Sequence, residues 1–160
     1  MVEILISGGP VMIPLGLLSG FVGGILDRIL SLIMDSIYSF PGLILAIAFA
    51  AALGPGVENA IVAISIANWP SYARLARAET LSVRNNDYIQ VIRSMGASNL
   101  RIMRLHVLPN IIGTLLVITT LQMGWAVLDV AALSFLGLGP PLGTPEWGTM
   151  LYEERVYLRD

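Results

Sequence analysis

Apolar positions dominate this chain in four long stretches that alternate with shorter polar segments. A helix needs about 20 apolar residues to cross the hydrocarbon core of a bilayer. Three of the stretches meet that requirement, and the fourth, 57–75, does so if Glu58 and Arg74 extend toward the two interfaces. The pattern predicts an all-α, polytopic membrane protein with about four transmembrane helices. We expect these at residues 4–24, 29–53, 57–75 and 108–130.

One long polar segment, 76–107, separates the third and fourth predicted spans. Its apolar residues recur at helical spacing, which predicts a short amphipathic helix. Such a helix either docks a partner from solution or lies on lipid headgroups, and its composition leaves both readings open. The expected apolar stripe comprises Tyr88, Val91, Ile92 and Met95, and the opposite face comprises Asp87, Gln90, Arg93 and Ser94.

The end of this polar segment has the residues of a helix–turn–helix connection. Gly96 permits a backbone turn that other residues resist, and Ser98 is placed to cap a second helix over residues 99–105. Pro109 suits the first turn of the following span, so we expect His106 and Pro109 to close the loop. His106 is expected to form hydrogen bonds at the interface rather than to act as a pH switch or ligand.

Small and acidic residues inside the predicted spans form a second set of candidates. Gly16, Gly20 and Gly24 recur every four residues, which predicts a smooth helix-packing stripe, although glycine is also common in membrane helices. Asp35 and Asp129 are intramembrane acids and therefore functional candidates, although capping or water contact also fits their positions near an interface. The glycine- and proline-rich stretch 133–148 predicts an outer-face loop with Trp147 at the headgroup level.

The composition agrees with a membrane protein and excludes several kinds of chemistry. The chain is 56% hydrophobic and 12% charged, about half the charged fraction of a typical soluble domain. It has no Cys and one His, so it offers no disulfide and no multi-histidine metal site, and we expect no catalytic residue, metal or cofactor. A net charge of −2 gives no indication of nucleic acid binding. It has no Lys, so it lacks a phosphate-binding P-loop, and an ATPase that powered it would be another polypeptide.

The distribution of arginine predicts the orientation. Six arginines fall in the 76–107 segment or, as Arg74, directly before it, and Arg28 lies between the first two predicted spans. Because successive spans cross in alternating directions, these two regions lie on the same side of the membrane. Only Arg155 and Arg159 fall on the other side, within 131–160. By the positive-inside rule, 76–107 is cytoplasmic, 131–160 is extracytoplasmic and the chain starts outside, as it would if a preceding span were missing.

Several short motifs in order along the chain resemble those of ABC importer permeases. Gly96 and the run from Leu105 to Pro109 fit the cytoplasmic loop pattern of that family, which begins with Glu-Ala-Ala. The remaining tags resemble its dipeptide/oligopeptide/nickel branch: Ser39-Phe40-Pro41, Trp69-Pro70-Ser71-Tyr72-Ala73-Arg74, Gly96-Ala97-Ser98, His106-Val107-Leu108-Pro109-Asn110, Leu133-Ser134-Phe135-Leu136-Gly137-Leu138-Gly139 and Pro145-Glu146-Trp147-Gly148.

The resemblance implies a permease of the type I ABC importer kind in the cell membrane. Its implied partners are a second permease subunit, cytoplasmic ABC ATPases and an extracytoplasmic substrate-binding protein. A cytoplasmic coupling helix would transmit ATPase closure to the spans. The implied ATPase-coupling residues are Tyr88, Gln90, Val91, Ile92, Gly96, Ala97, Ser98 and Arg101.

Two departures from the family pattern keep alternatives open. The Glu-Ala-Ala triplet is here Gln90-Val91-Ile92, which removes a carboxylate that could pair with the ATPase. The family usually has six spans, so four suggest truncation at both ends. A truncated, non-transporting scaffold or inactive relative is therefore the alternative function. An intramembrane enzyme is disfavoured, because the spans lack a paired nucleophile and base. The transported substrate is not identified.

Overall fold

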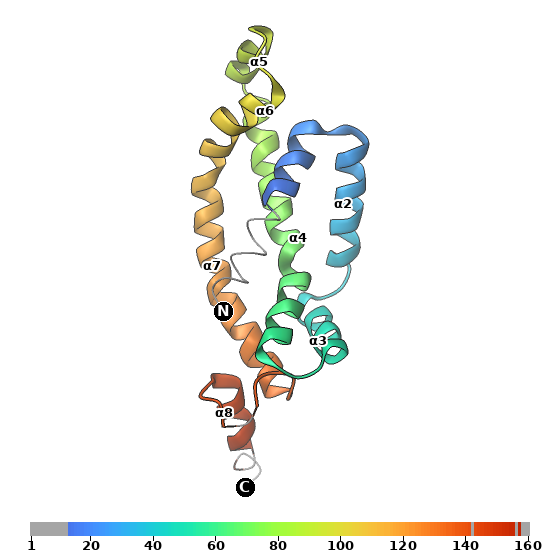
Figure 1. Ribbon diagram of the computed structural model, residues 1–160, viewed down its shortest axis with the longest axis vertical. Coiled ribbons are helices and arrows are strands. Elements are labelled where there is room, and N and C mark those ends of the chain that lie inside the picture. Colours follow the sequence, from blue (N-terminus) through green and yellow to red (C-terminus); the bar gives the residue numbers. More distant parts are fainter. Residues whose placement is uncertain (1–12, 142, 156, 158–160) are drawn as a thin grey trace. The chain divides into compact units, whose positions relative to one another are not determined.

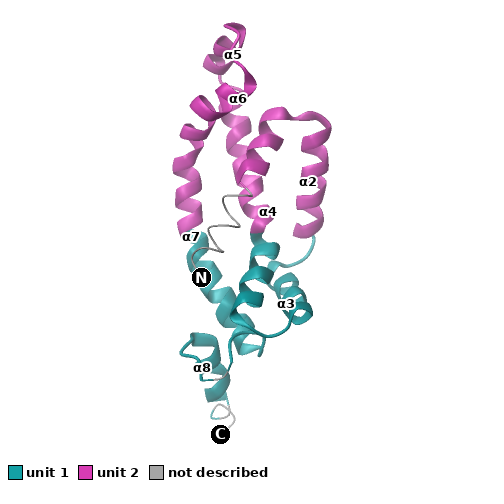
Figure 2. Ribbon diagram, viewed as in Figure 1, with its two compact units in different colours: residues 1–8, 39–68, 121–160 teal, residues 9–38, 69–120 magenta. Residues whose placement is uncertain are grey.

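The computed structural model describes residues 13–141, 143–155 and 157, and within these ranges every regular element is helical. The all-α fold class predicted from the sequence is therefore confirmed (Figure 1). The described residues divide into two compact units, one built from 39–68 and from residues beyond 120, the other from 13–38 and 69–120 (Figure 2). The elements are the helix Ile13–Val22, α2 Gly24–Tyr38, α3 Gly42–Leu53, α4 Val57–Arg84, α5 Asp87–Ser94, α6 Asn99–Ile102, the π-helix η1 Met103–Val107, α7 Leu108–Phe135 and α8 Trp147–Glu154.

One helical run among the described residues is long and apolar enough to cross a membrane. It extends from Asn99 to Phe135 with a mean hydropathy of 1.9. A second candidate arises if α2 and α3 count together as one broken span. Helix α4 has 28 residues, enough length to cross, but it does not reach the same hydropathy. The number and limits of the four expected spans stay predictions.

Within the expected span 29–53 the chain breaks between α2 and α3, and the two helices are bent by 86° at Pro41. Pro41 has φ −57° and ψ 128°, outside the helical region, and precedes the first residue of α3. Proline disfavours the helical conformation of the residue before it and donates no backbone hydrogen bond, which ends α2 at Tyr38.

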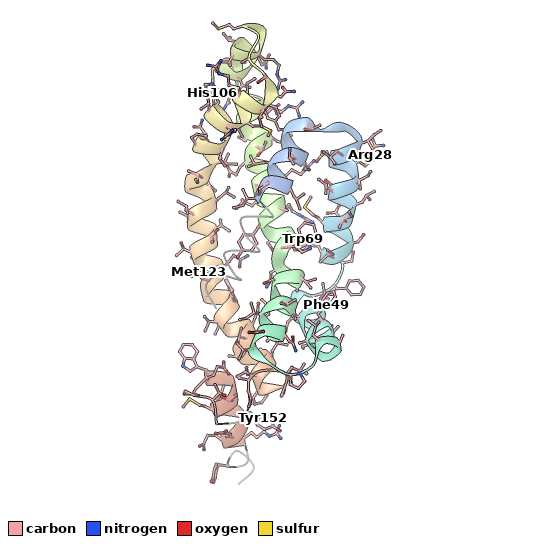
Figure 3. All side chains as sticks on the ribbon, viewed as in Figure 1. Arg28, Phe49, Trp69, His106, Met123 and Tyr152 are labelled. Atoms are coloured by element: carbon pink, nitrogen blue, oxygen red, sulfur yellow. The ribbon has the colours of Figure 1, made fainter. Side chains whose placement is uncertain are left out.

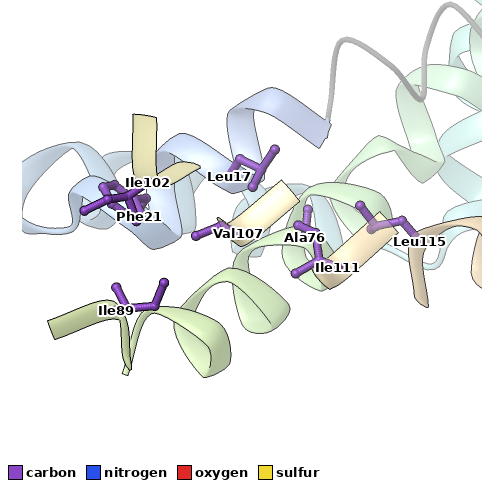
Figure 4. Close-up of a cluster of buried hydrophobic side chains, with 8 residues drawn as sticks. All are labelled: Leu17, Phe21, Ala76, Ile89, Ile102, Val107, Ile111 and Leu115. Atoms are coloured by element: carbon purple, nitrogen blue, oxygen red, sulfur yellow. The ribbon is translucent and has the colours of Figure 1, made fainter. Parts of the chain in front are cut away.

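The unit that contains α5 and α6 has a core of branched and aromatic side chains (Figure 4). These side chains come from the helix Ile13–Val22, from α4 to α7 and from η1, so residues far apart in the sequence share one cluster. Burying each such side chain contributes about 1.5–3 kcal/mol in water, so the cluster fixes the α5–α6 connection to the longer helices. Its buried members are Leu17, Phe21, Ala76, Ile89, Ile102, Val107, Ile111 and Leu115.

Two of the three glycines predicted as a packing stripe lie against α4. A β-carbon at Gly16 would collide with the Ala73 carbonyl oxygen, and one at Gly20 would lie 2.7 Å from the Arg77 carbonyl oxygen. The absence of side chains lets the two helix backbones approach closely. The prediction is wrong for Gly24, which starts α2 with φ +68° and where an added β-carbon would meet no atom within 4 Å.

The other unit has an alanine-rich core. Ala46 and Ala50 of α3 pack with four residues of α4, among them Ala60 and Ala63, and with Leu133 of α7. Small side chains on both helices allow α3 and α4 to lie close together, as the glycines do in the first unit. This unit also holds α8, described below with the outer loop.

The expected second helix over 99–105 does not end before the last span. Instead α6, η1 and α7 form one helical run. Pro109 lies in the first turn of α7, as expected. His106 lies in η1 (Figure 3), and the loop-closing role of the two residues stays a prediction. The π-helix explains why the chain continues. The Leu108 amide bonds to the Met103 carbonyl, a widened turn that accommodates Pro109, which has no amide hydrogen to donate.

Candidate functional site

Helix α5 presents an apolar face outward, opposite to the face that holds it in place. Ile89 is 1% exposed in the core and Ile92 packs against the same cluster. Val91 is 57% exposed, Met95 80% exposed, and Tyr88 is also exposed. The single stripe expected from the sequence is therefore divided, because Ile92 points inward and its three companions point outward. We call Tyr88, Val91 and Met95 the outer face of α5; Gln90 is also exposed.

The turn after α5 follows a glycine-dependent C-cap. Gly96 has φ +86°, its amide bonds to the Arg93 carbonyl at 3.0 Å, and the Ala97 amide bonds to the Ile92 carbonyl at 3.4 Å. This pair of bonds is the Schellman motif, in which the residue after the glycine packs back onto the helix. Ala97 and Ile92 do contact the same cluster. The sequence located this turn, and it sets the direction in which α6 leaves α5.

Ser98 occupies the N-cap position of α6 without using its side chain. Its backbone is extended, with φ −68° and ψ 149°, and its carbonyl accepts the Ile102 amide at 3.0 Å, but the hydroxyl makes no capping hydrogen bond. The serine borders a hollow of about 580 Å³ together with Arg101 and apolar side chains. The lining residues are Ser98, Leu100, Arg101, Arg104, Leu105 and Leu108. This surface combines apolar area with two cations, a chemistry that suits an apolar partner with acidic residues.

Contacts connect α5 to the helices that run toward the membrane. The Arg93 guanidinium lies 5.5 Å from the centre of the Phe21 ring, which is buried in the cluster. On the other side, Asn110 of α7 donates to the Tyr88 hydroxyl at 3.3 Å and to the His106 carbonyl at 2.6 Å. A force on α5 therefore reaches both the helix Ile13–Val22 and α7.

An ion pair that the sequence did not predict joins α2 to α4. The Arg77 guanidinium donates two hydrogen bonds to the Asp27 carboxylate, from Nε at 2.5 Å and from Nη2 at 2.8 Å, and the Ser19 hydroxyl donates a third. The Arg77 hydrogen bonds lower the pKa of Asp27 to about 2. Bonding to Asp27 raises the pKa of Arg77 in turn. Arg84 donates to the Gly20 carbonyl at 3.1 Å, so two arginines of α4 hold the Gly23–Gly24 turn.

The two acids that lie within predicted spans, Asp35 and Asp129, have different partners. Asp35 pairs with Arg74 at 2.7 Å on an exposed surface, where an ion pair contributes little to stability. Asp129 of α7 accepts a hydrogen bond from the Asn68 side-chain amide of α4 at 3.1 Å, and both residues are half-buried. The sequence singled out both acids but gave no information about these partners.

The segment between α7 and α8, predicted as an outer-face loop, is held in place by specific hydrogen bonds. Helix α7 ends just before Gly137, whose φ is +81°, with the same pair of C-cap bonds as α5. The Glu146 carboxylate then caps α8 by accepting the Gly148 and Thr149 amides. A side chain at Gly148 would collide with the Ala131 carbonyl, so α8 packs directly on α7. Trp147 is exposed, and its place at the headgroup level stays a prediction.

The part of the chain that the structure describes contains no candidate metal site. Within those ranges no three acidic or histidine side chains gather closely enough to bind an ion. The candidate surfaces are therefore a docking face on α5 and α6 and a polar pair between α4 and α7.

Comparison with known proteins shows similarity over nearly the whole chain. Residues 12–154 match the family described as binding-protein-dependent transport system inner membrane component. The dipeptide transport system permease protein DppC of Alkalihalophilus pseudofirmus is 42% identical over 145 residues, which cover 91% of this chain and 48% of that protein. The di/tripeptide transport system permease protein DppC of Pseudomonas aeruginosa is 46% identical over 144 residues, covering 90% and 48%. The glutathione transport system permease protein GsiD of Pectobacterium atrosepticum is 43% identical over 141 residues, covering 88% and 47%. The chain spans about half the length of these curated relatives.

Proposed function

Because this chain belongs to the family of binding-protein-dependent transport system inner membrane components, we propose that it is the membrane permease part of an ATP-driven importer of peptides or similar small solutes. Its relatives carry the names of dipeptide, tripeptide and glutathione permeases. ATP is hydrolysed by a separate chain, since this one has no Lys for a P-loop. The proposed partners are a second permease subunit, cytoplasmic ATPases and an extracytoplasmic binding protein.

The observation that carries the coupling role is the exposed outer face of α5. Three apolar side chains face outward on a helix that is otherwise anchored in a core, and exposed apolar patches mark interaction sites. The neighbouring hollow adds two arginines to this surface. Docking here would move α5 together with Phe21 and Asn110, and so would pass ATPase closure to the helix Ile13–Val22 and to α7.

The proposed orientation rests on arginine. Of the nine arginines, six belong to the polar segment with its flank and Arg28 belongs to α2. By the positive-inside rule, this distribution supports a cytoplasmic docking face. The outer loop and α8 then face the side from which a binding protein delivers solute.

Co-purification of the ATPase with the full-length protein that carries this segment tests the docking face. Val91→Glu puts a charge in the middle of the apolar surface, and burying an unpaired charge should reduce ATPase capture by about tenfold or more. Gln90→Glu restores the carboxylate of the family pattern at an exposed position, and capture should be kept or increased. Ser82→Glu is the matched control, since it adds the same charge to an exposed residue of the same segment that belongs to α4 and not to α5.

The outcomes separate the proposal from its alternative. Equal capture by Val91→Glu and Ser82→Glu would remove the docking role of α5. Failure of the unaltered protein to retain any ATPase, or to take up solute in proteoliposomes with all its companions, would favour the non-transporting scaffold that the Gln90-Val91-Ile92 triplet suggests.

A further inference from the structure

The Asp129–Asn68 pair is a polar site inside an otherwise apolar helix. Asp129 is the one charged residue in the sequence of α7, which belongs to the run with mean hydropathy 1.9. A carboxylate within an apolar helix is costly to bury, and acids in spans usually face a pathway or a partner rather than lipid. We therefore expect a group that compensates the negative charge of the Asp129 carboxylate.

The position of Asp129 on α7 directs it toward protein rather than lipid. Ala126, three residues before it, is 6% exposed, and Leu133, four residues after it, is 0% exposed. Residues three and four apart lie on one helical face, so Asp129 belongs to the buried stripe of α7. Gln122, two turns earlier on that stripe, is also half-buried, which adds a second polar group along the same line.

The local partner of Asp129 compensates only part of its charge. Among the described residues, its carboxylate takes part in one hydrogen bond, from the Asn68 amide, and in no ion pair. An amide donates a hydrogen bond but carries no positive charge. The side-chain oxygen of Asn68 faces Gly42 of α3, where an added β-carbon would lie 3.4 Å from it. The Asn68 amide thus joins α4 to α7 through the Asp129 carboxylate, which stays half-exposed.

We propose that Asp129, positioned by Asn68, binds the positively charged α-ammonium group of the peptide as it crosses the membrane. This inference rests on the proposed peptide import. Dipeptides, tripeptides and glutathione, named for the relatives, share a free α-ammonium group. A charge-assisted hydrogen bond from that ammonium group would compensate the negative charge of Asp129 while the peptide passes. When no peptide is bound, the Asn68 amide would hold the carboxylate in position.

The test measures peptide uptake and ATP hydrolysis together, in proteoliposomes that contain the full-length protein, its permease partner, its ATPases and saturating loaded binding protein. The probe is a radiolabelled dipeptide with a free amino group. Asp129→Asn should lower uptake per ATP hydrolysed by about tenfold, the loss expected for one hydrogen bond to a charged group. Asp129→Glu, which keeps the charge, should recover most of the uptake.

Asn68→Leu separates binding from structure. It removes the same hydrogen bond between α4 and α7 but leaves the carboxylate, so uptake per ATP should fall much less than in Asp129→Asn. Equal losses in the two variants, or a joint loss of assembly and basal ATP hydrolysis in Asp129→Asn, would make the pair purely structural and overturn the inference. Unchanged uptake per ATP in Asp129→Asn would overturn it as well. Absence of peptide uptake by the unaltered importer would instead overturn the proposed function.

Discussion

A single carboxylate, that of Asp27, holds three helices of its unit through Ser19 and Arg77. Its pKa is lowered to about 2, below the usual value of 3.8. A depressed pKa adds stability that is fully present above pH 3.8 and is lost as the pH falls toward 2. Asp27→Asn should therefore lower the unfolding temperature at neutral pH and flatten its dependence on pH between these values. Thermal unfolding in detergent at a series of pH values measures both effects.

Glu154→Gln is the control, since it neutralises an exposed carboxylate at the end of α8. Its unfolding temperature should follow that of the unaltered protein. If Asp27→Asn behaves like this control across the pH range, the ion pair adds no stability.

Residue-level prediction succeeded where the reason was local and failed where it was not. Gly96 could be identified because a positive φ angle limits the choice of residue. Ile89 could not, since α5 has two apolar sets at helical spacing, and only Phe21, Ile102 and Val107 decide which one turns inward. The partners of Asp27 and Asp129 lie 50 and 61 residues away, beyond the reach of any periodicity.

The contact between the helix Ile13–Val22 and α4 is an element-level feature that depends on two glycines. Gly16→Val should force the two backbones apart, because its side chain has no space beside Ala73 and Ala76. Overpacking of this kind costs about 1–3 kcal/mol. Gly124→Val is the control, since no atom lies within 4 Å of its would-be β-carbon. Cysteine cross-linking between the two helices should weaken in the first variant only, and equal cross-linking in both would contradict the assigned contact.

Element types followed from the sequence more readily than their limits. Apolar length predicted helices, and the helices are there, but the continuation of the 99–105 helix into α7 was missed. Pro41 and Pro109 have the same local effect, because each removes a backbone amide donor. The π-turn that precedes Pro109 accommodates this proline. The residue types from Met103 to Val107 do not predict such a turn.

At the scale of the whole molecule, the two units have separate cores of different composition, one branched and aromatic, the other mostly alanine. Ile102→Ala should destabilise the first core by about 2–5 kcal/mol, as for other buried Ile to Ala changes. Leu133→Ala should do the same in the second. Hydrogen exchange should then accelerate mainly in the unit that carries the change. Uniform acceleration throughout the chain in both variants would mean that the units unfold as one.

The π-turn of η1 holds one residue more than an ordinary helical turn would at that place. Each residue of an α-helix turns the chain by about 100° around its axis. Deleting one residue between Met103 and Val107 would remove the widened turn, and the chain before it would rotate by about 100° around the helix axis. The direction in which Tyr88 and Val91 point, relative to α7, therefore depends on one extra residue in this turn.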